Sequence, residues 1–371
     1  MAGCGQARSA HPGAAIHCPT GFLCAYYDPS ARYRQPTPSP GWRQVASPGL
    51  PADALFYAIT ATGAADAWAV GTTGARSTER QPLIIHWDGL VWGRVALPAS
   101  TLRLSAFQSV AAAGRGDVWV TGVGADEWLT PHVYHFDGAR WAEVGLPAYV
   151  DAVEGISMTP AGHLWAVCAT RVYPGDCVIR WNGRSWTRFP APPVLTGGPA
   201  DIAALADNDI WVTGTPSQIY HWDGARWTRT ASPAVSHGGA VPQIAALASD
   251  DVWAAGAVGT SFSSPPLLPV LLHWDGHGWQ KVPVPRAGSF PLAGIAPDGA
   301  GGIWVAPWHS DWLGARYLHW RAGRWTDVYA NPPGPLSAEF AVAIAPVPGT
   351  EQVWSADDGP DGMTLNLYTP R

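Results

Sequence analysis

Charge is scarce in this chain of 371 residues, and lysine is almost missing from it. Charged side chains make up 13% of the residues, the formal net charge is −6, and Lys281 is the only lysine. Proteins that bind nucleic acid by neutralising phosphates carry clustered Lys and Arg, and this sequence has no such stripe. We therefore expect no nucleic-acid partner.

Long apolar runs and the short motifs of common enzymes are also missing. No stretch of 18 or more apolar residues could form a transmembrane helix. The chain has no G-x-S-x-G, no H-E-x-x-H, no P-loop and no paired-cysteine zinc pattern. The segment from Asp357 to Asp361 faintly resembles a calcium loop, but Tyr368 stands where an EF-hand carries its closing Glu. We expect no metal and no cofactor, and we assign no catalytic residue.

What the chain has in plenty is Gly (42), Pro (36) and Trp (22), arranged in seven copies of one unit. Each copy contains an apolar segment followed by a second apolar segment with a central Trp. These are Trp68, Trp119, Trp165, Trp211, Trp253, Trp304 and Trp354. Self-similarity at about 40–50 residues is typical of radial β-architectures.

A tight turn follows in six of the units. The first copy is HWDGLVW from His86, and the sixth is HWRAGRW from His319, which has lost the Asp and moved the Gly by one. Asp-Gly or Asn-Gly between β-rich runs predicts a hairpin, because Gly accepts a positive φ. We place this turn between strands c and d of a blade whose strand b carries the Trp. The pattern predicts an all-β fold, a seven-bladed β-propeller of four-stranded blades.

The two ends of the repeat region complete each other. Residues 365–368 match strand c with no strand d after them, and residues 41–45 match strand d with nothing before them. The N-terminal strand is therefore expected to close the last blade, since an open ring would expose a strand edge. We assign residues 41–371 to the propeller and residues 1–40 to a tether or linker segment.

Loop lengths indicate which surface varies. The interval from the strand-b Trp to the strand-c aromatic runs from 11 residues (Trp211 to Trp222) to 21 (Trp253 to Trp274). Function tends to sit on variable loops held by a rigid scaffold, so the b–c loops are the candidate binding surface. Aromatic and polar residues outside the repeat are the candidate ligand-binding residues: Trp128, Tyr173, Phe262, Trp308, His309, Asp311 and Trp312. The alternative is that these aromatic side chains fold down over the ring as packing.

Two polar positions recur within the repeat. Five His residues occupy one position of strand c (86, 135, 221, 273 and 319), where we expect each to lie beside a strand-b Trp in a structural role. Asp66, Asp117, Asp209 and Asp251 precede the Trp by two residues, and we expect them to bond turn amides.

Cys168 and Cys177 could pair across a hairpin or stay as two reduced core thiols, and disulfides would imply an oxidising compartment. A disulfide from Cys168 to Cys177 would set Trp165 against Arg180, and the same register sets Trp211 against His221 in the next blade. Cys18 and Cys24 could close a small second loop. Cys4, in Met-Ala-Gly-Cys, resembles the end of a bacterial lipoprotein signal, which implies lipidation of Cys4 if the true start lies upstream. The other interpretation is a chance match.

The repeats resemble those of bacterial secreted propellers of the kelch and Asp-box kind, on the D-G-x-x-W turns over about residues 41–371. The leading Ser-x-Asp of an Asp-box is missing. This resemblance implies lectins, adhesion and scaffold modules, sialidases or lyases, and fold alone does not choose among them.

Our first hypothesis is a monomeric extracellular or cell-surface protein, carbohydrate-binding or protein-binding through its b–c loops. The alternative is a secreted carbohydrate-active hydrolase or lyase with a site at the central channel. A third hypothesis is a structural interaction module. Carboxylates converging at the channel mouth would favour the enzyme.

Overall fold

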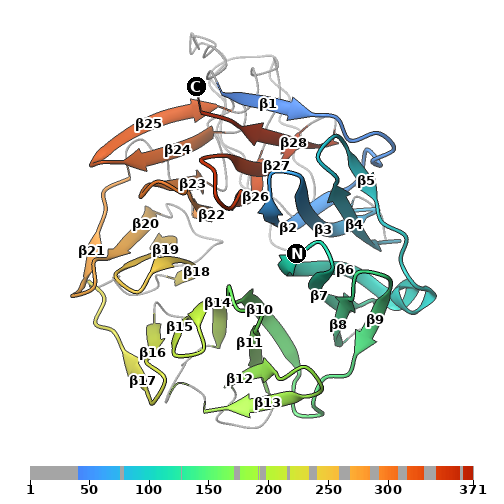
Figure 1. Cartoon of the computed structure of the whole chain (residues 1–371), viewed down its shortest axis with the longest axis horizontal. Helices are drawn as coiled ribbons and strands as arrows, with labels where there is room; N and C mark the ends of the chain where they lie inside the picture. Colours follow the sequence, from blue (N-terminus) through green and yellow to red (C-terminus); the bar gives the residue numbers. More distant parts are fainter. Residues whose placement is uncertain are drawn as a thin grey trace, which may run out of the picture. The chain divides into compact units, whose positions relative to one another are not determined.

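Seven antiparallel sheets of four strands each form the blades of a β-propeller (Figure 1). The structure is a computed structural model. It describes residues 41–75, 79–126, 128–170, 176–190, 192, 198–214, 218–233, 240–258, 268–284, 292–307, 316–329, 340–359 and 362–370. These residues belong to one compact unit. Within them, no helix is long and apolar enough to cross a membrane. The seven-bladed fold predicted from the repeats is confirmed.

The blades follow one another along the chain, each from its inner strand a to its outer strand d. Blade 1 consists of β2 (Leu55–Gly63), β3 (Asp66–Thr73), β4 (Gln81–Trp87) and β5 (Trp92–Arg94). Blade 2 consists of β6 (Leu104–Gly114), β7 (Asp117–Gly124), β8 (Pro131–Phe136) and β9 (Trp141–Val144). Blade 3 consists of β10 (Ala152–Met158), β11 (Leu164–Ala169), β12 (Asp176–Trp181) and β13 (Trp186–Phe189). Blade 4 consists of β14 (Pro199–Ala206), β15 (Asp209–Gly214), β16 (Gln218–Trp222) and β17 (Trp227–Arg229). Blade 5 consists of β18 (Ala240–Ala248), β19 (Asp251–Val258), β20 (Leu268–Trp274) and β21 (Trp279–Lys281). Blade 6 consists of β22 (Leu292–Pro297), β23 (Ile303–Pro307), β24 (Arg316–Arg321) and β25 (Arg324–Tyr329). Blade 7 consists of β26 (Phe340–Pro346), β27 (Val353–Gly359) and β28 (Gly362–Tyr368), with β1 (Trp42–Val45) as its outer strand. The 3-10 helix η1 (Ala99–Arg103) lies between blades 1 and 2.

The c–d turns form as their sequence predicts. In blade 1, Oδ1 of Asp88 accepts hydrogen bonds from the backbone N–H groups of Leu90 (2.8 Å) and Val91 (2.9 Å), while Gly89 adopts a φ of 101°. The same Asx turn recurs at Asp137, Asn182, Asp223 and Asp275. Blade 6 has no such Asp, and there Ala322 (φ 49°) and Gly323 (φ 75°) make a two-residue turn between β24 and β25.

The core lies between neighbouring blades. The seven Trp residues of strand b are at most 3% exposed. Trp354 of the last blade shows how they pack, because its ring lies edge-on to Trp87 and Trp92 of the first blade at 5.1 and 5.0 Å. Each strand-b Trp therefore fastens one blade to the next.

The last blade is closed by the N-terminal strand, as the two ends of the repeat predicted (Figure 1). Strand β1 pairs antiparallel with β28, setting Trp42 against Tyr368 and Val45 against Leu365. The Trp42 ring then stacks on Tyr317 of blade 6 with a centroid distance of 4.7 Å. The ring is thus closed both by main-chain pairing and by aromatic packing.

Candidate functional site

The alternation of strand direction divides the connections between two faces of the propeller. The b–c and d–a connections emerge on one face, which we name the loop face. The a–b and c–d turns emerge on the other, the turn face.

The turn face carries a repeated pair of side chains in which an Asp accepts a hydrogen bond from a His ring. The distances are 2.7–2.8 Å for His86 with Asp66, His135 with Asp117, His221 with Asp209, His273 with Asp251, and His319 with Asp298. Each His ring also lies against the strand-b Trp of its own blade, with centroids 4.0–4.3 Å apart. The predicted position of the His beside the Trp is confirmed.

The predicted partner of the Asp was wrong. In place of turn amides, the carboxylates of Asp117, Asp209 and Asp251 accept hydrogen bonds from the indole N–H of the Trp two residues on, at 2.9–3.1 Å, and from the His ring. Asp66 binds His86 and the Thr62 hydroxyl. The turn amides are taken by the Asp or Asn of the c–d turn instead, since that side chain is adjacent in sequence.

Electrostatics support a structural role for these pairs. Burial alone would raise the pKa of Asp66, but the hydrogen bonds from His86 and Thr62 outweigh it, and the pKa is lowered. The pKa values of Asp209 and Asp298 are lowered in the same way, against the effect of burial. Burial lowers the pKa of His319, although its hydrogen bond with Asp298 acts in the opposite direction. In each pair the His ring and the carboxylate are hydrogen-bonded to each other, and this bond holds strands b and c together.

Among the described residues, the inner strands of two adjacent blades carry one carboxyl group each toward the central channel. Burial raises the pKa of Glu154 on β10, and it raises that of Asp201 on β14 to about 7. Both oxygens of Asp201 accept backbone N–H groups, however, from Ile202 (2.9 Å) and from Ile244 of the next blade (3.1 Å). Asp201 therefore ties two inner strands together. No group of three or more metal-ligating side chains occurs in the part of the chain that the structure describes.

A fully buried polar cluster lies between blades 6 and 7. The carboxyl of Asp357 receives hydrogen bonds from the hydroxyls of Tyr317 and Ser355 and from the amide of Asn366. All four residues are completely buried. Burial raises the pKa of Asp357 well above its usual value, and the Asn366 amide offsets this only in part. Asp357, the first residue of the calcium-like segment, is thus hydrogen-bonded within the interior of the protein.

The cluster predicts a pH effect on stability. The folded protein keeps the Asp357 proton at a pH where the unfolded chain has released it, so stability from this group is present near pH 4 and is lost as the pH rises toward the raised pKa. Asp357→Asn keeps the shape and cannot titrate. We expect the thermal midpoint of the wild type, relative to that of the variant, to fall as the pH rises from about 4. Circular dichroism melts of both proteins test this, and parallel profiles would contradict it.

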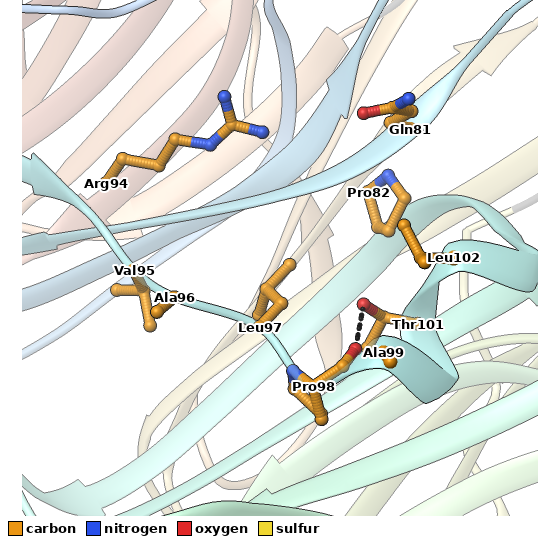
Figure 2. Close-up of a pocket in the computed structure, with 10 residues that line it drawn as sticks. All are labelled: Gln81, Pro82, Arg94, Val95, Ala96, Leu97, Pro98, Ala99, Thr101 and Leu102. Atoms are coloured by element: carbon orange, nitrogen blue, oxygen red, sulfur yellow. Dashed lines mark hydrogen bonds between the residues drawn. The ribbon is translucent and has the colours of Figure 1, made fainter.

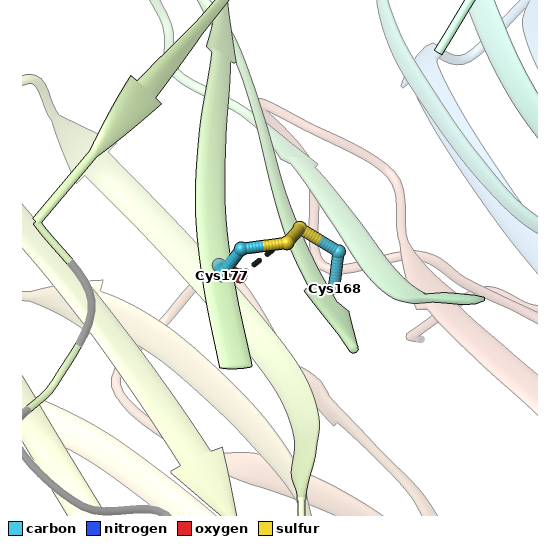
Figure 3. The surroundings of a disulfide bond; sticks show 2 residues. All are labelled: Cys168 and Cys177. Carbon is cyan, nitrogen blue, oxygen red and sulfur yellow. Dashed lines mark hydrogen bonds between the residues drawn. A yellow bond between two sulfur atoms is a disulfide. The ribbon is translucent and has the colours of Figure 1, made fainter. Parts of the chain in front are cut away.

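Blade 3 contains a disulfide between Cys168 at the end of β11 and Cys177 on β12 (Figure 3). The two residues are directly opposed in the strand register, with Cα atoms 4.9 Å apart, and both are completely buried. The register that the bridge implied is present in both blades, with Trp165 opposite Arg180 and Trp211 opposite His221.

The loop face of blade 2 presents two large apolar side chains to solvent. Trp128 is 67% exposed and Leu129 is 58% exposed. Oδ1 of Asp126 fixes the loop by accepting the N–H groups of Trp128 (3.1 Å) and Thr130 (3.0 Å). The hydrogen bonds from Thr130 hold the pKa of the Asp126 carboxyl below its usual value. Leu129 adopts a φ of 50°, which a residue with a Cβ rarely takes, so the backbone is strained where the apolar tip is displayed.

A groove of about 510 Å³ lies on the same face where the chain leaves blade 1 (Figure 2). Its floor and walls are the start of β4 and the connection from β5 into η1. The lining residues are Gln81, Pro82, Arg94, Val95, Ala96, Leu97, Pro98, Ala99, Thr101 and Leu102. Leu102 is 75% exposed. The carbonyl of Arg103, the last residue of η1, accepts the Ala125 N–H of the blade 2 loop at 2.9 Å. We name the groove together with Trp128 and Leu129 the blade 1–2 surface.

The structure places one of the predicted ligand-binding residues, Trp128, on this surface. The others, Tyr173, Phe262, Trp308, His309, Asp311 and Trp312, lie outside the described residues, as do Cys4, Cys18 and Cys24. Sequence reasoning missed Leu129, Leu102 and Arg94. An isolated Leu or Arg carries no local signal, and only the ring arrangement brings the blade 1 exit and the blade 2 loop together.

Comparison with known proteins shows the fold and leaves the function open. No protein-family model and no curated protein matches the chain. A catalytically inactive virginiamycin B lyase from Staphylococcus aureus with quinupristin is similar over 89% of this chain and 99% of the lyase, with a TM-score of 0.63 and 15% identity. YCF48 bound to D1 peptide is similar over 89% of this chain and 97% of that protein, with a TM-score of 0.60 and 15% identity. The WD40 repeats of RRP9 match over 91% and 100%, with a TM-score of 0.61 and 11% identity.

Proposed function

We propose that this protein binds an extended polypeptide segment through the blade 1–2 surface. The observation that carries the proposal is the exposed Trp128–Leu129 tip, which is flanked by hydrogen bonds from the Trp128 and Thr130 N–H groups to Asp126. A Trp displayed beside a groove is typical of binding hot spots, since Trp gives a large contact area for little loss of conformational entropy. The hydrogen bonds to Asp126 reduce the ordering of the tip that binding requires.

The comparisons support a binding role without naming the ligand. One propeller of similar fold was solved with a bound peptide, which shows that the architecture can present such a site. The alternative of a hydrolase or lyase at the channel would need carboxylates that are free to act. Both oxygens of Asp201 are taken by backbone N–H groups, which leaves Glu154 without a second free carboxyl on the described inner strands, so this arrangement favours the binding role.

An extracellular or cell-surface location is part of the same proposal. The buried Cys168–Cys177 bridge supports it, because disulfides form and persist in oxidising compartments. Lipidation at Cys4 is a compatible means of attachment to the cell surface.

The proposal predicts that Trp128→Ala weakens ligand binding by at least about 30-fold, the loss typical of a hot-spot Trp. A phage-displayed random peptide library would be panned on the full-length protein, and the enriched peptides measured by biolayer interferometry against wild type and variant. Leu90→Ala is the matched control, because Leu90 is 83% exposed in a c–d turn on the turn face.

Two results would overturn the proposal. One is a panning that enriches no peptide over an unrelated protein, or only peptides that bind Trp128→Ala as tightly as wild type. The other is binding on a glycan array that Trp128→Ala abolishes while no peptide binds, which would make the ligand a carbohydrate.

A further inference from the structure

We propose that the blade 1–2 groove selects ligands that carry a carboxylate, which pairs with Arg94, beside apolar side chains that contact Leu97 and Leu102. The inference rests on the proposed function and adds the chemical class of the ligand. It follows from the shape of the groove, the charge at one end of it, and the missing backbone donor along one wall.

The apolar part of the groove lies in its middle and at one end. Figure 2 shows Leu97 between Arg94 at one end and Thr101 and Leu102 at the other. The volume of about 510 Å³ lies within the range of about 300–1,000 Å³ that is common for ligand sites. Pro82, Val95, Pro98 and Ala99 complete an apolar lining that can accept ligand side chains but cannot orient them by polar contacts.

Arg94 supplies the charge. It is exposed, and it has no ion pair with any residue within the described ranges. Arg103, at the far end of η1, is by contrast already paired with Glu143. Among the described residues that line the groove, Arg94 is the one with a charged side chain. A guanidinium matches a carboxylate in a bidentate geometry, which makes a carboxylate the complementary group.

The backbone along the β4 wall cannot serve as the main recognition element. The Ile84 carbonyl accepts the Val95 N–H at 3.0 Å and therefore points toward β5. Backbone polar groups of residues two apart in a strand point the same way, so those of Pro82 also point toward the β5 side, where the groove lies. Pro has no N–H to donate, and a ligand strand laid along this edge would find a carbonyl but no donor. Recognition therefore depends on side chains, and Arg94 is the one that can discriminate by charge.

The test uses two synthetic peptides with the sequence of the strongest clone from the library, one with its acidic residue intact and one with Gln or Asn in its place. Arg94→Gln is expected to weaken the acidic peptide about tenfold and to leave the amide peptide unchanged, since one charge-assisted pair is lost. Arg140→Gln on the turn face is the control. Arg140 is 82% exposed, and its substitution should change neither affinity.

The outcomes separate this inference from the proposed function. If enriched peptides depend on Trp128 but show no acidic preference, or bind Arg94→Gln as tightly as wild type, the carboxylate selection is wrong and the binding role stands. If no peptide is enriched, both are wrong. Equal weakening of both peptides by Arg94→Gln would also overturn the inference, because it would show lost packing in place of lost charge.

Discussion

Replacement of Trp42 by Ala is expected to lower the free energy of unfolding by about 3–5 kcal/mol, the loss usual for a buried Trp. Trp42 is 8% exposed, and its ring contacts those of Tyr317 (4.7 Å), Trp304 (5.5 Å) and Tyr368 (5.5 Å). It joins the first strand of the propeller to blades 6 and 7, so its loss weakens the closure of the ring as well as leaving a cavity. The midpoint of urea unfolding, followed by far-UV circular dichroism, measures the effect.

Arg43→Ala is the matched control for this prediction. Arg43 lies next in β1, pairs with Leu367 through the same backbone ladder and is exposed. Its substitution should shift the midpoint little. Equal midpoints for the two variants would show that ring closure relies on the backbone ladder of β1 and that the packing of Trp42 adds nothing to it.

Removal of the disulfide has the second large expected effect. Cys168 and Cys177 are separated by nine positions, and cross-linking a loop of that length stabilises a protein by about 2–3 kcal/mol through the unfolded chain. The variant with both Cys168→Ala and Cys177→Ala should be less stable by at least this amount, because the buried sulfur atoms also pack in the core of blade 3. Urea unfolding with and without a reducing agent gives the measurement.

The reducing agent supplies the internal control. It should lower the unfolding midpoint of the wild type and leave that of the double variant unchanged. A midpoint of the wild type that is insensitive to reductant under unfolding conditions would contradict a stabilising bridge at this position.

The repeat shows how far local signals reach. The Asp-Gly turn at 88–89 is predictable because its geometry involves only adjacent residues, namely a side-chain oxygen of Asp88 and the amides two and three positions on. The register of Cys168 with Cys177 is predictable for a similar reason, since a short hairpin leaves few pairings. The closure of the last blade by β1 follows from counting strands at the two ends.

The partners of the Asp residues show where such reasoning ends. Asp66 binds His86, which is 20 positions away, through the pairing of two strands. In blade 3 the indole of Trp165 donates to Asp207, which belongs to the next blade, 42 positions along the chain. Asp207 also binds His163 and Arg180 at 2.8 and 2.7 Å. A pattern within one unit does not contain the carboxylate that a neighbouring unit supplies.

By itself the sequence determined the class of fold, the number of blades, the strand order and the hairpin register, because each depends on turns and alternation within one repeat, and it determined the closure through the incomplete repeats at its two ends. It also singled out Trp128, since that Trp falls outside the repeat. Only the tertiary structure decided that Trp128 shares a surface with Leu102 and with a groove that ends at Arg94, and that Asp357 is buried beside Tyr317. These features form between blades, where the packing of one repeat on the next sets the surroundings of each side chain.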